Sequence, residues 1–160
     1  MALTAQSGTE IALLNTGVPG AVESATKVMV NADVLFTITG GPIQILSLVS
    51  VCIANNDATA STLQYQSVPT VGSAATISGA SASLANPTAG STVLLTPTAL
   101  STAPVIVAAS AGGVQLGPNL GNKIIVNAGT IKAVIGVGST TGTWKHYLHY
   151  YPLTKNVVVV

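Results

Sequence analysis

The sequence predicts an all-β protein, either an antiparallel β-sandwich or a jelly roll, with an extended N-terminal arm. Short apolar stretches broken by glycines and prolines are typical of strands and turns, and no amphipathic run reaches helical length. Aromatic residues make up only 4% of the chain, so Val, Ile and Leu must build the core, and these residues favour strands. The length of 160 residues suits one domain. We predict an arm over residues 1–25 and a single β-sandwich domain over residues 26–160.

The predicted arm carries isolated apolar side chains among Thr, Ser and Gly, including Leu3, Ile11 and Leu13. A turn-like Gly-Val-Pro-Gly sequence over residues 17–20 follows them. Apolar residues in an arm need a surface to cover, which a neighbouring subunit could supply, and a frayed terminus is the alternative. Leu3, Ile11 and Leu13 are therefore candidate interface residues.

The first two strands are expected at residues 26–30 and 34–39, joined by a turn at residues 31–33. In the second of these strands the apolar side chains of one face recur with a period of two, at Val34, Phe36 and Ile38. This pattern predicts a hairpin.

The segment 43–54 is the longest and most apolar strand candidate. One parity holds Ile43, Ile45, Val49, Val51 and Ile53, and the other holds Leu46, Leu48 and Cys52. One face of a sheet normally meets solvent, so either a bulge near Leu46 shifts the register or a neighbouring copy of the chain covers the second face. Leu46 and Leu48 are accordingly candidate interface residues.

The middle of the chain predicts brief strands at residues 63–68, 93–96 and 105–108. Between the first two, residues 73–90 approach low complexity, with many Ala, Ser and Gly and no charge. Such a segment suits either a mobile loop or a close backbone contact with a partner.

The last strands are expected at residues 123–127, 130–137 and 143–151, and glycines over residues 136–142 predict a hairpin between the final two. In the final strand Trp144 and Leu148 mark the core face. Tyr147, His149 and Tyr151 lie on the other parity and are candidate interface residues. The strand also holds a cluster of aromatic residues, Trp144, Tyr147, Tyr150 and Tyr151. This cluster fits core packing, a subunit interface or a platform for a sugar ring.

We expect no enzyme activity. The four acidic residues show no paired-carboxylate pattern, and Asp33 and Asp57 fall at predicted turns, where their side chains would bond to the local backbone. His146 and His149 are three apart in a strand and point to opposite faces, so a shared metal site would have to form between subunits. Cys52 lies in an apolar run and would be a small buried hydrophobe. We expect neither a metal nor another cofactor.

Low charge is the most unusual bulk property of the chain. Only 6% of the residues are charged and the net charge is +1, with no basic cluster to bind a phosphate backbone directly. No secretory signal opens the sequence, and its apolar runs are too short to span a bilayer, so we expect neither export nor a membrane partner. A chain with so little charge is better suited to a protein assembly than to life as a free monomer. We therefore expect homo-oligomers.

Two stretches resemble small β-rich virion proteins of tailed bacteriophages. The first is VLFTITGGPIQILSLVSV over residues 34–51, and the second runs from GTIK at residue 129 to TWKHYLHYYPL at residues 143–153. The shared pattern is a strand, Thr-Gly-Gly-Pro and a long apolar strand, followed late in the chain by a glycine turn and an aromatic strand ending in Pro-Leu.

The resemblance implies a non-enzymatic structural role, most like that of a capsid decoration (cement) protein. Such a protein would be made in the host cytoplasm, form a homotrimer on the capsid surface of the virion, and clamp subunits of the major capsid protein. The alternative is a tail, fibre or appendage module that binds a host surface glycan or another tail protein.

Overall fold

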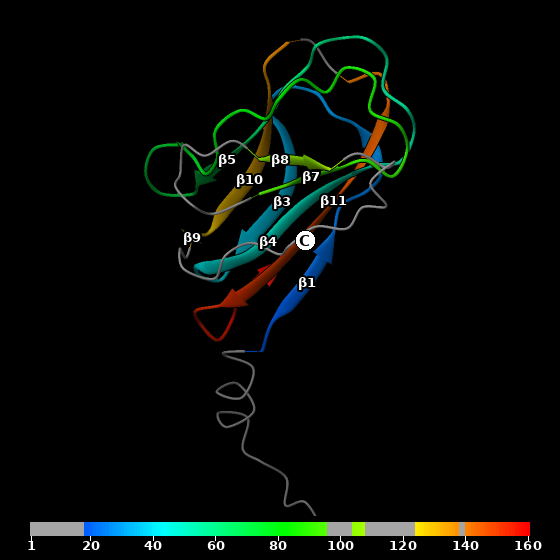
Figure 1. The fold of residues 1–160 in the computed structure, drawn as a ribbon. Helices are drawn as coiled ribbons and strands as arrows, with labels where there is room; N and C mark the ends of the chain where they lie inside the picture. Colours follow the sequence, from blue (N-terminus) through cyan, green and yellow to red (C-terminus); the bar gives the residue numbers. More distant parts are fainter. Residues whose placement is uncertain (1–17, 96–103, 108–123, 138–139) are drawn as a thin grey trace, which may run out of the picture.

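The computed structural model describes residues 18–95, 104–107, 124–137 and 140–160, and these residues form two antiparallel sheets without a helix (Figure 1). The seven-stranded sheet has the order β1 (Gly20–Glu23), β11 (Thr143–Pro152), β4 (Ile43–Cys52), β7 (Thr92–Leu94) and β8 (Val105–Val107), with β2 (Lys27–Val28) beside β11 and β9 (Ile124–Val126) beside β4. The five-stranded sheet has the order β12 (Val158–Val159), β3 (Asp33–Thr39), β10 (Gly129–Ile135), β5 (Leu63–Pro69) and β6 (Ala75–Thr76). The predicted all-β sandwich is confirmed.

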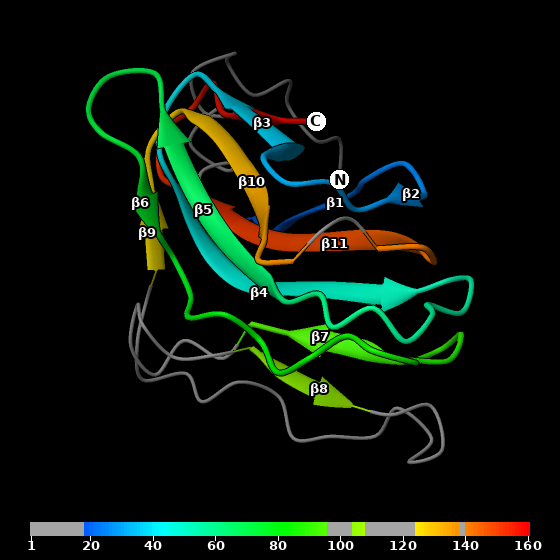
Figure 2. The same cartoon turned by 90° about the horizontal axis from the view of Figure 1, so that it is seen from above.

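The core lies between the two sheets, which Figure 2 shows from above. Its largest fully buried side chains include Trp144 and Leu148 from β11, Tyr65 from β5 and Phe36 from β3. Full burial of a side chain of Leu or Phe size contributes about 2–3 kcal/mol. The prediction that Trp144 and Leu148 face the core is confirmed.

A β-bulge at Leu46 decides which side of β4 faces the core. His149 pairs with Ser47 while the next residue, Tyr150, pairs with Ile45, so Leu46 is the extra residue. Before the bulge Ile43 and Ile45 are buried, and after it the opposite parity is buried, at Leu48, Ser50 and Cys52. Of the two explanations for an apolar run of both parities, the bulge is the one found here.

A second bulge occurs in β3, the strand before β4. β10 pairs Ile131 with Phe36 and Lys132 with Val34, which leaves Leu35 as the extra residue. Leu35 and Phe36 are both buried, whereas Val34 is 40% exposed. The predicted common face of Val34, Phe36 and Ile38 is therefore wrong at Val34.

Neither predicted hairpin forms. β10 and β11 belong to different sheets, so the glycine-rich connection over residues 136–142 leads from one sheet to the other. The turn at residues 31–33 likewise leads from β2, which pairs with β11, to β3 in the opposite sheet. The strands themselves lie where they were expected, but each pairs with a strand far away in the sequence and not with its neighbour across the turn.

The structure also corrects the boundary of the arm, because Gly20–Glu23 pair with β11 as β1. Residues 18–25 therefore belong to the sandwich. Residues 1–17, with Leu3, Ile11 and Leu13, lie outside the described residues.

The serine-rich segment 73–90 packs along the edge of β5. The backbone amides of Leu63 and Tyr65 donate hydrogen bonds to the hydroxyl oxygens of Ser81 and Ser78, at 2.9 and 3.0 Å. Ile77 and Leu84 enter the core from the same segment. Serine hydroxyls thus replace part of a backbone ladder, a role that neither sequence interpretation of this segment anticipated.

Asn56, in the loop after β4, holds together three loops at one end of the sandwich. Its Oδ1 accepts hydrogen bonds from the amides of Thr141 and Gly142 and from the Thr141 hydroxyl, at 2.7 to 3.0 Å. Its Nδ2 donates to the carbonyl of Leu84 at 2.7 Å. Because Asn56 is buried, these partners cannot easily turn to water instead.

We expect Asn56→Ala to lower the free energy of unfolding by on the order of 3 kcal/mol, because it leaves several buried polar groups without partners. Urea unfolding followed by tryptophan fluorescence measures this loss. The neighbouring Asn55 is exposed and its Oδ1 accepts one bond, from the Ala89 amide, so Asn55→Ala is the matched control with an expected loss of about 1 kcal/mol. Equal losses in the two variants would contradict the role of Asn56.

Candidate interaction surface

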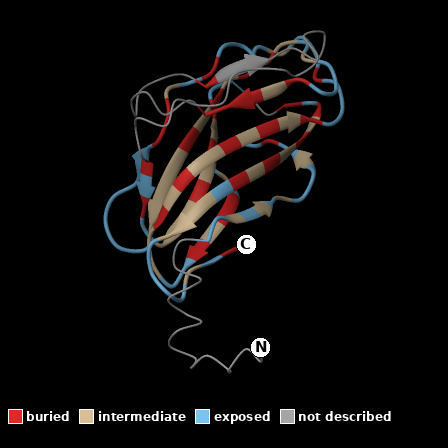
Figure 3. Cartoon of the chain, turned by 60° about the horizontal axis from the view of Figure 1, so that its bottom comes forward, coloured by how far each residue is buried: buried red, intermediate tan, exposed pale blue. Residues whose placement is uncertain are grey.

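The outer face of the seven-stranded sheet carries a group of partly exposed apolar and aromatic side chains. The register places Tyr147 of β11 opposite Val49 of β4, with Val51 on the same face of β4. We call this group the outer-face patch, and it consists of Leu46, Val49, Val51, Tyr147 and Tyr151. In Figure 3 the two long strands show alternating bands of burial, because every second side chain points away from the core.

The charges beside the patch neutralise each other. Lys145 Nζ lies 2.7 Å from Glu23 Oε1 and 5.8 Å from the centre of the Tyr147 ring. The hydrogen bond from Lys145 to Glu23 raises the pKa of the lysine. An exposed pair of this kind contributes little to stability, but it leaves the border of the patch without net charge.

A shallow depression of about 220 Å³ lies at one side of the patch, between β1 and β11. Ala21, Val22, Glu23, Tyr147 and His149 line it. His149 is exposed and its Nδ1 lies 3.2 Å from the hydroxyl oxygen of Ser47. The depression offers an aromatic ring, a carboxylate and an imidazole to a neutral polar ligand.

The structure separates the predicted interface residues. Tyr147, His149, Tyr151 and Leu46 reach the surface of the seven-stranded sheet. Leu48 does not, because the bulge turns it into the core, where it is fully buried, and its assignment to an interface is wrong. The same register shift brings Val49 and Val51 outward, although their parity in the sequence predicts the other face.

One buried cluster has the composition of a catalytic dyad. The hydroxyl oxygen of Ser50 lies 2.6 Å from His146 Nδ1 and 2.8 Å from the Tyr65 hydroxyl. All three side chains are 0% exposed, and His146 Nε2 has no hydrogen-bond partner among the described residues. The cluster is closed to solvent, and its hydrogen bond between Ser50 and Tyr65 connects the two sheets.

Burial controls the ionisation of this cluster. It lowers the pKa of His146 to about 4, and the positive charge of Lys27 acts in the same direction while Asp33 opposes it. Burial also raises the pKa of Tyr65. At neutral pH the imidazole and the phenol are therefore both uncharged, as a core requires.

The other side chains considered for chemistry in the sequence are buried or are engaged in local contacts. Trp144 is fully buried and cannot take part in a sugar platform, and Cys52 is buried, which raises the pKa of its thiol. Asp57 forms the predicted turn bond by accepting from the Thr59 amide at 2.8 Å, but Asp33 pairs with Lys27 instead of the local backbone. In the described part of the chain no three His, Cys, Asp or Glu side chains lie close enough to hold a metal ion.

A comparison of the chain with protein-family models, curated proteins and solved structures found no match. Within the described ranges, no helix is long and apolar enough to cross a membrane.

We expect the chain to lose stability as the pH falls from about 6.5 to about 4. In this range the unfolded chain binds a proton at His146 and the folded chain does not, so acid favours unfolding. The loss is about 3 kcal/mol if the whole difference in pKa is expressed. Urea unfolding at a series of pH values measures it.

Most of the pH dependence should be lost in His146→Leu and should persist in His149→Gln, whose imidazole is exposed. NMR titration of the unmodified chain supplies a second test if the first variant does not fold. An imidazole signal of His146 that titrates near pH 6.5 would contradict the expectation.

Proposed function

We propose that this chain is a non-enzymatic structural protein of a virion, a decoration protein that forms a homotrimer and binds the major capsid protein on the capsid surface. The outer-face patch is the observation that carries the proposal. It presents valine and tyrosine side chains on a rigid sheet, and the nearest charges are paired with each other. The virion, the capsid and the trimer come from the sequence resemblance, which supports the same kind of role.

Two properties of the outer-face patch favour contact with a protein, its composition and its rigidity. Protein interfaces favour tyrosine and disfavour charged residues at their centres, as in this patch. Rigid strands hold the side chains of Val49, Val51 and Tyr147 in place, so little conformational entropy is lost when a partner binds. Each buried Å² of apolar surface contributes about 25 cal/mol to association before these costs are subtracted.

A tail or appendage module that binds a host glycan is the second candidate, and the depression beside Tyr147 favours it. Glu23 and His149 could accept and donate hydrogen bonds to sugar hydroxyls while the ring of Tyr147 stacks on the sugar. A glycan array probed with the unmodified chain and with Tyr147→Ala tests this candidate. Binding that depends on Tyr147 would favour it over the capsid role.

We expect the purified chain to be multimeric in light scattering and to bind saturably to emptied, expanded capsids that lack it. Tyr147→Glu should weaken capsid binding on the order of ten-fold or more, because it places a charge in the patch. Val71→Glu is the matched control, since Val71 is 85% exposed in a loop after β5 in the other sheet. A monomeric chain that binds no capsid lattice would refute the proposed function.

A further inference from the structure

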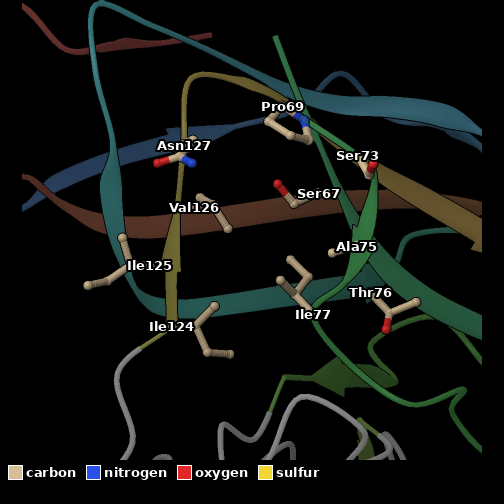
Figure 4. A pocket seen from close by; sticks show the side chains of 10 residues that line it. All are labelled: Ser67, Pro69, Ser73, Ala75, Thr76, Ile77, Ile124, Ile125, Val126 and Asn127. Carbon is tan, nitrogen blue, oxygen red and sulfur yellow. The ribbon is translucent and has the colours of Figure 1, made fainter. Parts of the chain in front are cut away.

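A second apolar opening lies at one end of the sandwich, between β9 of one sheet and β6 of the other (Figure 4). Its volume is about 460 Å³. Ile77, Ile124 and Val126 give it an apolar wall, and Ser67 and Thr76 add hydroxyl groups. None of the described residues that line it is charged. Apolar side chains on a neutral backbone are the chemistry that fits it.

Both strands at the opening are edge strands. Among the described residues β9 pairs only with β4, and β6 pairs only with β5. Figure 2 shows β9 and β6 beside each other at this corner of the sandwich. An edge strand presents unpaired backbone N–H and C=O groups, which an added extended segment can satisfy. Ile125 of β9 is 58% exposed, so an added strand would also cover apolar surface.

The N-terminal segment of the chain has the composition of such an added strand. In residues 9–15 the sequence TEIALLN alternates Ile11 and Leu13 with Ala12 and Leu14, and Glu10 is its only charged residue. Four small or apolar residues in a row, bordered by polar ones, suit a strand whose two faces are both covered.

The register shows where the segment leaves the sandwich. Gly20 pairs with Tyr150, Tyr150 with Ile45, and Ile45 with Ile124, so the start of β1 and the opening lie at the same end, three strand spacings or about 14 Å apart. The turns at residues 40–42 and 153–156 lie at the ends of β4 and β11, which stand between β1 and β9.

These two turns are fixed to each other, and within one chain they lie between the start of β1 and the opening. The amide of Leu153 donates to the carbonyl of Pro42 at 3.0 Å, and the hydroxyl of Thr154 donates to the carbonyl of Gly40 at 3.1 Å. The 17 residues before Val18 span up to about 60 Å when extended, which is enough to reach another molecule.

We propose that residues 9–15 of one copy add as a strand to the edge of β9 in the opening of a second copy. This inference rests on the proposed function in one respect, that the chain assembles with itself. It goes beyond that function by naming the contact: an arm of one subunit and the β9–β6 opening of the next.

Disulfide trapping between two single-cysteine additions tests the proposal. Full-length Leu13→Cys is mixed with full-length Ile125→Cys and oxidised, and a covalent heterodimer is expected. Val137→Cys replaces Ile125→Cys in the control, because Val137 is 56% exposed but follows Ile135, which pairs with Leu63 at the far end of β5. We expect a yield roughly ten-fold or more above the control, since docking raises the effective thiol concentration. An excess of a synthetic peptide of residues 5–17 should lower this yield.

Two results would overturn the inference. One is a yield no higher than the control, and the other is a Leu13→Cys/Ile125→Cys double variant that forms only an internal disulfide and stays monomeric, which means that the arm occupies its own opening. A multimer that binds capsids but shows no trapped pair would refute this inference and leave the proposed function standing. A trapped pair without capsid binding would support this inference and refute the capsid role of the proposed function.

Discussion

The register shift at Leu46 is the constraint on which both the core and the outer surface depend. A period of two means that one inserted residue exchanges the faces of everything beyond it. In β4 this exchange sends Leu48, Ser50 and Cys52 inward and Val49 and Val51 outward. The pairing partner β11 needs no bulge of its own, so Trp144, His146 and Leu148 keep one face throughout. The valines of the outer-face patch therefore face outward because of a single extra residue.

The core tolerates polar atoms where they connect the two sheets. Ser50 and His146 come from the seven-stranded sheet and Tyr65 from the five-stranded one. The hydrogen bond between Ser50 and Tyr65 crosses the gap between the layers, and the one between Ser50 and His146 joins β4 to β11. A chain with few aromatic residues has few large side chains with which to fill a sandwich, and the polar cluster fixes the relative position of the sheets in addition to filling space. The cost is a histidine that must remain neutral, which couples the stability of the fold to pH.

The sequence predicted the strands well and their partners poorly, for a physical reason. Alternation and turn residues are local, and they were sufficient to locate the long strands β3, β4, β10 and β11. Pairing depends on contacts between residues far apart in the sequence, such as Gly20 with Tyr150, which a local pattern does not contain. The short strands β1, β6 and β12 were missed because two to four residues show too little alternation.

The candidate interface residues differ in their positions for the same physical reason. Tyr147 and Tyr151 were assigned from parity in a strand without its own bulge, and that assignment placed them on the outer face correctly. Leu48 was assigned from parity in β4, beyond a bulge whose presence the sequence suggested but could not establish, and it proved to be core. Apolar residues at both parities of one strand indicate either a bulge or a covered second face. Only the structure distinguishes these two explanations.

The two surfaces described above would have different roles in the proposed assembly. An arm that enters the opening of a neighbour makes a heterologous contact, since the two subunits contribute different surfaces, and such contacts close into a ring when the rotation between subunits permits it. A ring of three is the simplest closure that agrees with the proposed trimer. The opening lies at the end of the sandwich by β9 and β6, whereas the outer-face patch lies on the broad face of β4 and β11. Subunit contacts through the opening would thus leave the patch of every subunit available for the capsid lattice.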